Sequence, residues 1–230
     1  MVDYNSRVKP WKTSAMYLVF LAFLALAQAQ KVFEVQEGAP IGTLIGSIGT
    51  PGPYLIVPID QTANPEEDLI VNQSNGEIRT KQVLDREKQE EYVFSAIPLN
   101  GESIQVKVKI LDINDHTPDF GQDQFTIDIP ENIPSGTKRK LPSAKDPDED
   151  GVKSYQIVRG NVGEAFDLQF DGQDTLDLVV KGSLDREKLD KYSMVIVAED
   201  GGTPSRSSSM TLTVQVQDLN DSPPVFSKQR

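Results

Sequence analysis

The stretch Leu84-Asp85-Arg86-Glu87-Lys88 occurs a second time, unchanged, as Leu184-Asp185-Arg186-Glu187-Lys188. Another motif recurs behind each copy: Asp112-Ile113-Asn114-Asp115 returns as Asp218-Leu219-Asn220-Asp221, each followed by Pro and Phe. Repetition over such a distance indicates tandem units of one architecture. The length of 230 residues suits two small domains.

The sequence around these motifs has the pattern of short β-strands. Ile104, Val106, Val108 and Ile110 alternate with polar residues, and residues 210–216 do the same. Such alternation is typical of half-buried strands in antiparallel sheets. Clusters rich in Gly, Pro and Asn separate the strands at residues 50–53, 72–76, 132–136 and 201–204. Short strands divided by turn signals predict a β-sandwich in each unit.

The unit limits follow from the polar, proline-containing segment that ends the first unit. We expect the first repeat at residues 31–118 and the second at residues 119–226. Residues 227–230 are then the start of a further repeat or a tail, and we expect the chain to be a fragment or truncated form of a longer protein.

Residues 1–29 have the features of a secretory signal. Three basic residues precede the apolar run 15–27, and Ala27-Gln28-Ala29 is a small-x-small cleavage site. An uncleaved anchor is the alternative, although the run is short for a membrane span. Removing this segment takes away three basic residues and one acid, so the net charge changes from −12 to −14. This charge argues against nucleic acid as a partner.

The absence of cysteine bears on both stability and catalysis. Small secreted domains usually depend on disulfides, so a metal bound only by the native state is a plausible replacement. With no Cys and one His, nucleophilic triads lack their components. The paired carboxylates recur in both halves, which a single glycosidase-type active site does not require. We expect that the chain is not an enzyme.

Acidic residues gather in the repeated motifs. Asp85 and Glu87 share a face if their segment is extended, and so do Asp146 and Asp148. Calcium accepts six to eight carboxylate, amide and carbonyl oxygens in irregular geometry, whereas zinc requires His or Cys ligands. A solvated acidic surface is the alternative, but the identical repeats favour a calcium site.

These motifs resemble those of the cadherin superfamily, particularly protocadherin-type and other cadherins that do not exchange an N-terminal strand. The resemblance covers residues 31–226 and rests on the following segments: Gln36-Glu37-Gly38, Pro130-Glu131-Asn132, the two Leu-Asp-Arg-Glu-Lys copies, Asp146-Pro147-Asp148, Ala198-Glu199-Asp200-Gly201-Gly202 and the two Asp-x-Asn-Asp motifs. It implies an all-β fold of two tandem seven-stranded Greek-key β-sandwiches with immunoglobulin-like architecture, joined end to end. The only tryptophan is Trp11, inside the signal segment, so exchange of an N-terminal tryptophan is not expected.

The resemblance also implies about three calcium ions at the junction between the repeats. The ligands expected there are Glu37, Asp85, Glu87, Asp112, Ile113, Asn114, Asp115, His116, Asp146, Asp148 and Asp200, with Ile113 and His116 acting through their carbonyls. A second half-site is expected at Glu131, Asp185, Glu187, Asp218, Asn220 and Asp221. The first repeat lacks the Asp-x-Asp and Asp-Gly-Gly segments, as expected of a repeat with no neighbour before it.

The function implied is calcium-dependent cell–cell adhesion or recognition by repeats that calcium stiffens. The alternatives are an anchorless ectodomain that acts as a decoy, and a structural extracellular spacer. The expected partner is another cadherin-type ectodomain, in homophilic or heterophilic binding, rather than nucleic acid or a small-molecule substrate. We expect a secreted chain or one on the extracellular face of the plasma membrane. Asn72-Gln73-Ser74 is a candidate glycosylation site at Asn72.

Overall fold

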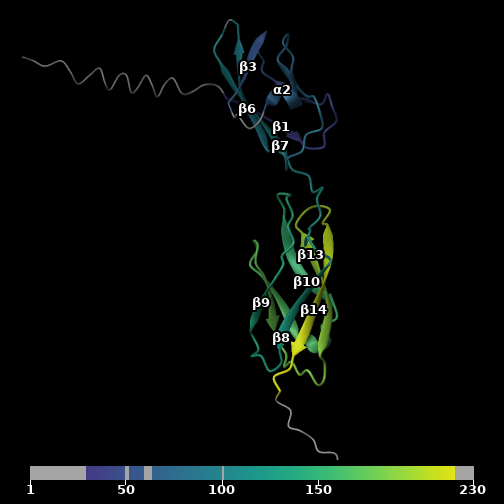
Figure 1. The fold of residues 1–230 in the computed structure, drawn as a ribbon. Coiled ribbons are helices and arrows are strands. Elements are labelled where there is room, and N and C mark those ends of the chain that lie inside the picture. Colours follow the sequence, from purple (N-terminus) through teal and green to yellow (C-terminus); the bar gives the residue numbers. More distant parts are fainter. Residues whose placement is uncertain (1–29, 50–51, 60–63, 100, 221–230) are drawn as a thin grey trace, which may run out of the picture. The chain divides into compact units, whose positions relative to one another are not determined.

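The computed structural model describes residues 30–49, 52–59, 64–99 and 101–220 (Figure 1). The predicted signal segment, the tail 227–230 and the predicted ligand Asp221 lie outside the described residues. The chain divides into two compact units, which we call unit 1, ending at Ile113, and unit 2, beginning at Asn114. This division falls a few residues before the predicted repeat limits at 118 and 119.

Unit 1 is a sandwich of a four-stranded sheet and a three-stranded sheet. Its strands are β1 (Gln30–Gln36), β2 (Leu44–Ser47), β3 (Tyr54–Pro58), β4 (Leu69–Val71), β5 (Glu77–Thr80), β6 (Glu91–Pro98) and β7 (Ile104–Leu111). The strand orders are β1-β7-β6-β3 and β2-β5-β4. A four-residue helix, α2 (Pro65–Asp68), precedes β4.

Unit 2 repeats this arrangement. Its strands are β8 (Gln124–Pro130), β9 (Lys138–Leu141), β10 (Val152–Arg159), β11 (Phe166–Phe170), β12 (Leu176–Val180), β13 (Lys191–Asp200) and β14 (Ser207–Gln217). The strand orders are β10-β13-β14-β8 and β11-β12-β9. A short 3-10 helix, η1 (Val162–Glu164), stands where unit 1 has α2. The seven strands of each described unit confirm the predicted fold class.

One feature of the sheets differs from the prediction. β1 pairs with β7 in parallel, and β8 pairs with β14 in parallel, while the remaining pairs are antiparallel. The alternating pattern was interpreted as typical of antiparallel sheets. Alternation reports only which side chains face the core, because successive residues point to opposite faces whatever the direction of the neighbouring strand.

The cores confirm the predicted alternation. Val106, Val108 and Ile110 on β7 are buried, as are Leu212 and Val214 on β14. Each core contains the inward residues of both of its sheets. Burying such aliphatic side chains contributes about 1.5–3 kcal/mol each to stability relative to exposing them. The core of each unit therefore supports the loops in which the acidic motifs lie.

The short helix α2 was not predicted. Asn64 caps it by accepting a hydrogen bond from the Glu66 amide at 3.2 Å, and Pro65 occupies the first turn, where its missing N–H costs nothing. A helix of four residues is too short to produce a 3.6-residue apolar period. The Asn-Pro pair was the available signal for it.

Candidate metal centres

A buried glutamate organises the acidic end of unit 1. Glu37 directly follows β1 and is 4% exposed. Its Oε2 accepts a hydrogen bond from the Arg86 amide at 2.8 Å, and its Oε1 accepts one from the Ile113 amide at 2.7 Å. One carboxylate thus joins the repeated Leu-Asp-Arg-Glu-Lys motif to the segment that follows β7. Oxygen atoms of Glu37, Glu87 and Asp112 come within 4.8 Å of one another.

The arginine of the repeated motif lies among these acids. Arg86 Nη2 is 2.5 Å from Glu87 Oε1, and Arg86 Nε donates to Asp112 Oδ1. The three side chains are largely buried. A buried carboxylate requires such a partner, because removing an ion from water costs several kcal/mol. Sequence reasoning assigned no role to Arg86, although its place between two acids was a signal.

The repeated motif is a turn and not the extended segment on which the expected shared face of Asp85 and Glu87 depended. The amides of Lys88 and Gln89 both donate to the Asp85 carbonyl, at 3.3 and 3.1 Å. The Asp85 carboxylate instead pairs with Lys88 Nζ at 2.7 Å. Asp85 is absent from the unit 1 group of three neighbouring acids, which contains Glu37, Glu87 and Asp112. The two-residue alternation of a strand does not apply in a turn, although in the same turn of unit 2 oxygens of Asp185 and Glu187 come within 4.8 Å of each other.

Unit 2 begins with predicted ligands that its own loops hold in place. Asn114 Nδ2 donates to the Pro204 carbonyl at 2.7 Å, and this bond fixes the orientation of its amide. Asp200 ends β13, is 4% exposed, and accepts from the amides of Gly202 and Arg206 through Oδ1. The other polar atom of each side chain, Oδ1 of Asn114 and Oδ2 of Asp200, has no hydrogen-bond partner among the described residues.

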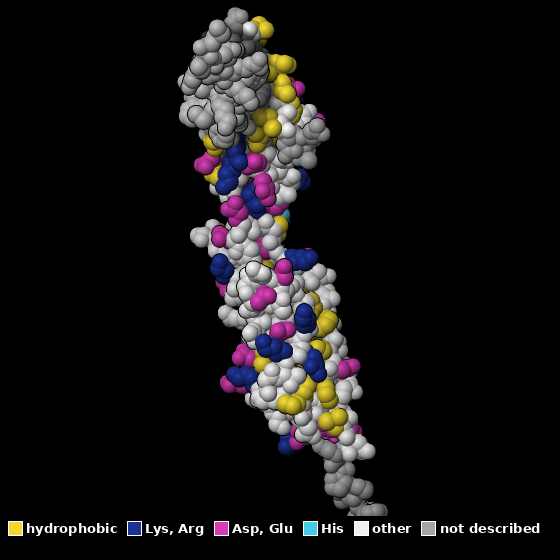
Figure 2. Space-filling model, turned by 90° about the vertical axis from the view of Figure 1, so that its left-hand side faces the viewer, with side chains coloured by type: hydrophobic (Ala, Val, Ile, Leu, Met, Phe, Trp, Pro, Cys, Tyr) yellow, Lys and Arg dark blue, Asp and Glu magenta, His cyan; other side chains and the backbone are white. Residues whose placement is uncertain are grey.

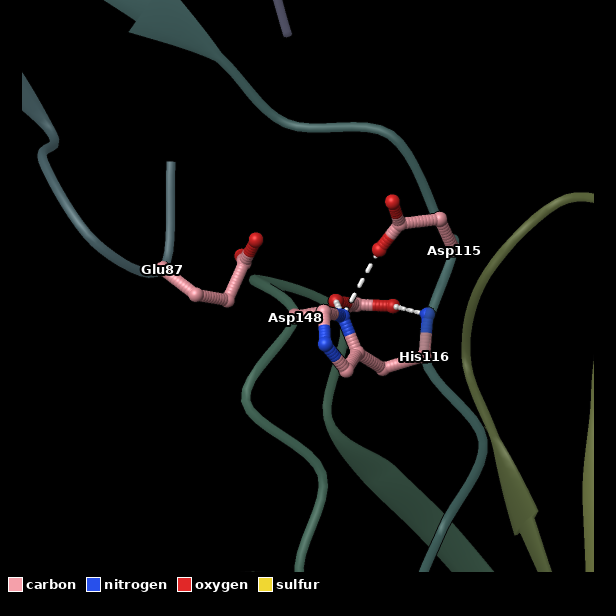
Figure 3. A group of neighbouring side chains, drawn as sticks. All are labelled: Glu87, Asp115, His116 and Asp148. Atoms are coloured by element: carbon pink, nitrogen blue, oxygen red, sulfur yellow. Dashed lines mark hydrogen bonds and ion pairs between the residues drawn. The ribbon is translucent and has the colours of Figure 1, made fainter. Parts of the chain in front are cut away.

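The Asp-x-Asp loop lies between β9 and β10. Asp146 Oδ1 accepts from the Asp148 amide at 3.1 Å. The ring of His116 lies between two carboxylates: His116 Nδ1 is 2.7 Å from Asp115 Oδ1 and 2.9 Å from Asp148 Oδ1 (Figure 3). The His116 amide donates to Asp148 Oδ2 at 2.9 Å. The loop therefore brings Asp148 beside Asp115 and His116.

The end of unit 2 that follows β14 has the same construction as the end of unit 1. Glu131 is 1% exposed, and its two oxygens accept from the amides of Arg186 and Leu219, each at 2.9 Å. Oxygens of Glu131, Asp185 and Glu187 come within 4.8 Å of one another. Arg186 Nη2 pairs with Asp218 at 2.9 Å. Asn220 is exposed there, with its amide donating to Asp218 Oδ1 at 2.6 Å.

Unpaired buried oxygens test whether these residues suit a cation. Within the described residues, six buried side-chain polar atoms have no hydrogen-bond partner. Four of them belong to predicted ligands: Glu87 Oε2, Asn114 Oδ1, Asp146 Oδ2 and Asp200 Oδ2. Native proteins rarely leave such atoms unsatisfied, since each costs about 1–3 kcal/mol. All four are the oxygen ligands that calcium prefers.

The pKa shifts of the predicted ligands also favour a cation site. Burial raises the pKa of Glu87, and the hydrogen bond and charge of nearby Glu37 add to this effect. Burial also raises the pKa of Asp146, with the charges of Asp148 and Asp200 adding to it. For Asp200 burial is outweighed by hydrogen bonds from the backbone, above all from Arg206, so its pKa is lowered. Glu87 and Asp146 therefore lack a positive neighbour sufficient to stabilise their charged forms.

Surface charge elsewhere is mixed. Acidic and basic side chains are interspersed on the face drawn in Figure 2. Partly exposed pairs such as Lys107–Glu91, at 2.5 Å, contribute little to stability. The predicted glycosylation residue Asn72 is exposed, and its Oδ1 accepts from the Ser74 amide at 2.8 Å.

Comparison with known proteins identifies the family. A family model described as "Cadherin domain" matches residues 125–217. Protein dachsous of Drosophila melanogaster is 40% identical over 95% of this chain, and human Protocadherin-16 is 35% identical over 86%. The crystal structure of Protocadherin Gamma C5 EC1-3 matches with a TM-score of 0.70 and 28% identity, covering 84% of this chain and 67% of that one. The chain belongs to the cadherin superfamily.

The relatives are much longer than this chain, which spans 7% of the length of dachsous and 6% of that of Protocadherin-16. Cadherin relatives are adhesion proteins of the cell surface or extracellular space, and cadherin repeats generally bind calcium where one repeat meets the next. Among the described residues, no helix is long and apolar enough to cross a membrane.

Replacing Glu37 tests whether its two backbone hydrogen bonds stabilise unit 1. Glu37→Gln keeps one acceptor oxygen but turns an NH₂ group towards a backbone N–H, so one hydrogen bond is lost and two donors face each other. We expect metal-free unit 1 to lose about 1–3 kcal/mol of unfolding free energy, measured by denaturant unfolding in chelator. Exposed Glu102→Gln is the control and should change stability by less than about 0.5 kcal/mol. Equal unfolding free energies of the two variants would show that the hydrogen bonds of Glu37 do not stabilise unit 1.

Proposed function

We propose that this chain mediates calcium-dependent cell–cell adhesion or recognition, with calcium bound by acidic residues of both units. The resemblance to cadherins suggests the class of activity, and the unpaired oxygens of Glu87, Asn114, Asp146 and Asp200 are the observation that carries the proposal. In unit 1 we assign Glu37, Asp85, Glu87, Asp112 and the carbonyl of Ile113 to calcium. In unit 2 we assign Asn114, Asp115, Asp146, Asp148, Asp200 and the carbonyl of His116.

The physical reason is the repulsion among buried acids. Like charges a few ångströms apart cost roughly 4 kcal/mol per pair near a protein surface. Arg86 is a cation among the acids of unit 1, and in unit 2 the ring of His116 lies against Asp115 and Asp148. Calcium supplies positive charge that several carboxylates can share at once. We propose about three ions, and we propose that they hold the repeats in a fixed relation to each other.

The remaining acidic group, Glu131, Asp185, Glu187 and Asp218 with Asn220, has the construction of the unit 1 group. We propose that it is half of a further calcium site, in which Asp221 also takes part. Fewer ligands come from one unit than a complete site requires, so we expect this group to bind calcium weakly.

Amide substitutions test the calcium site without disturbing the backbone hydrogen bonds. Asp200→Asn can keep the oxygen that accepts from Gly202 and Arg206 while replacing unpaired Oδ2 by NH₂. We expect wild-type chain to gain about 2.7 kcal/mol of stability at a calcium concentration one hundred times Kd. Asp200→Asn should weaken calcium binding by about tenfold or more, equivalent to about 1.4 kcal/mol, in a calorimetric titration.

Asp174→Asn is the matched control for this titration, because Asp174 is an exposed acid of the same unit. It removes the same charge and should leave the calcium affinity within about twofold of wild type, since exposed distant charges are screened by salt. The assignment is wrong if both variants bind calcium as tightly as the wild type, or if both weaken equally.

Adhesion itself is tested with beads that carry the chain. We expect beads to aggregate in calcium and to disperse in chelator, with Asp174→Asn behaving like wild type and Asp200→Asn requiring more calcium. If coated beads stay dispersed but the chain blocks aggregation by another cadherin ectodomain, the decoy function replaces this proposal. If neither effect occurs, the chain is a spacer.

A further inference from the structure

Both units have a surface hollow beside the repeated motif, and the two hollows differ. In unit 1 it measures about 200 Å³ and is lined by Asp68, Gln82, Asp85, Lys88 and Tyr92, among others. In unit 2 it measures about 430 Å³ and is lined at the matching positions by Ala165, Gly182, Asp185, Lys188 and Tyr192. The Asp–Lys pair is the same in both, at 2.7 and 2.6 Å.

A shared backbone contact establishes which residues correspond. The Lys81 amide donates to the Asp68 carbonyl at 2.7 Å, and the Lys181 amide donates to the Ala165 carbonyl at 2.8 Å. Ala165 therefore stands where unit 1 has Asp68. Replacement of Asp68 and Gln82 by Ala165 and Gly182 accounts for the larger hollow, because both side chains become smaller.

The carboxylate of Asp68 has a defined role in unit 1. The Tyr92 hydroxyl donates a hydrogen bond to Asp68 Oδ2. Burial, together with this hydrogen bond and the Asp68 charge, raises the pKa of Tyr92. The tyrosine hydroxyl therefore donates to a carboxylate in a hollow that the Asp85–Lys88 ion pair also lines.

The matching tyrosine of unit 2 has no such partner. Tyr192 is 6% exposed and contacts Phe166 edge-on, with ring centroids 5.0 Å apart. Within the part of the chain that the structure describes, its hydroxyl has no hydrogen-bond partner, and it is not among the fully enclosed unpaired atoms. It therefore reaches the water of the hollow. The small residues Gly163, Ala165 and Gly182 leave room beside it, and Val162 adds an exposed apolar wall.

We propose that the unit 2 hollow is a binding site for a carboxylate group, which accepts a hydrogen bond from Tyr192 as Asp68 does from Tyr92. The ligand is either a small free carboxylate or an Asp or Glu side chain of a peptide segment. Charge-assisted hydrogen bonds are roughly twice as strong as neutral ones, so a carboxylate fits better than a neutral acceptor. The volume of about 430 Å³ lies within the usual range for ligand sites.

The test is a titration of the metal-free chain, followed through its backbone amide signals by NMR. Metal-free protein is used because Asp185 also belongs to a proposed calcium group. The probes are acetate, a capped Ala-Asp-Ala peptide and its Ala-Asn-Ala counterpart. We expect saturable shifts at Gly163, Gly182 and Ser183 with half-saturation on the order of millimolar. Stronger binding of the Asp peptide than of acetate identifies a peptide ligand, and the reverse identifies a free carboxylate.

Two reciprocal substitutions make the comparison between the units decisive. Ala165→Asp supplies the missing carboxylate and should abolish the shifts in unit 2. Asp68→Ala opens the hollow of unit 1 and should create saturable shifts at Gln82 and Lys88 that the wild type lacks. Tyr192→Phe should weaken binding in unit 2 at least about fivefold, whereas Tyr155→Phe, remote from the hollow's lining, should not.

The proposal is overturned if no probe produces saturable shifts at the hollow, if the Asn peptide binds as well as the Asp peptide, or if Tyr192→Phe leaves the affinity unchanged. If Ala165→Asp prevents folding of unit 2, Asp68→Ala still decides the matter in unit 1. Failure of calcium binding would leave this result unaffected, because the titration contains no metal.

Discussion

In both units a buried glutamate connects the repeated motif to the end of the last strand. Glu37 and Glu131 each accept two backbone hydrogen bonds, one from the arginine of the motif and one from the residue after the Asp of Asp-x-Asn-Asp. Burying a carboxylate is costly unless it accepts hydrogen bonds, and these backbone amides supply them. Several of the other acids are next to these donors in the sequence: Asp85, Glu87 and Asp112 in unit 1, and Asp185, Glu187 and Asp218 in unit 2.

The arrangement of charge supports the proposed calcium sites. Arg86 compensates part of the unit 1 acidity, but one oxygen of Glu87 stays unpaired, as do single oxygens of Asn114, Asp146 and Asp200 in unit 2. Each of these side chains uses its other polar atom for a hydrogen bond that fixes its orientation. Ligands held in this way need little reordering when a cation arrives, which favours affinity.

Much of the architecture could be predicted from sequence, because alternation on β7 and β14 reports a buried face directly. The direction of β1 and β8 could not be predicted, because the alternation within one strand is the same whether its neighbour is parallel or antiparallel. The identity of the acids was visible from repetition, whereas the role of Arg86 and the turn around Asp85 depend on contacts between distant segments. The sequence also did not show that Ala165 stands where unit 1 has Asp68. This correspondence follows only from the matching hydrogen bonds of the Lys81 and Lys181 amides.

The central claim is that calcium, held by acids of both units, fixes the relation between the repeats. Small-angle X-ray scattering of the chain in calcium and in chelator tests it most directly. The account predicts a single extended distance distribution in calcium and a broader, more compact distribution in chelator, with recovery when calcium is restored. Superimposable scattering profiles under the two conditions would contradict it.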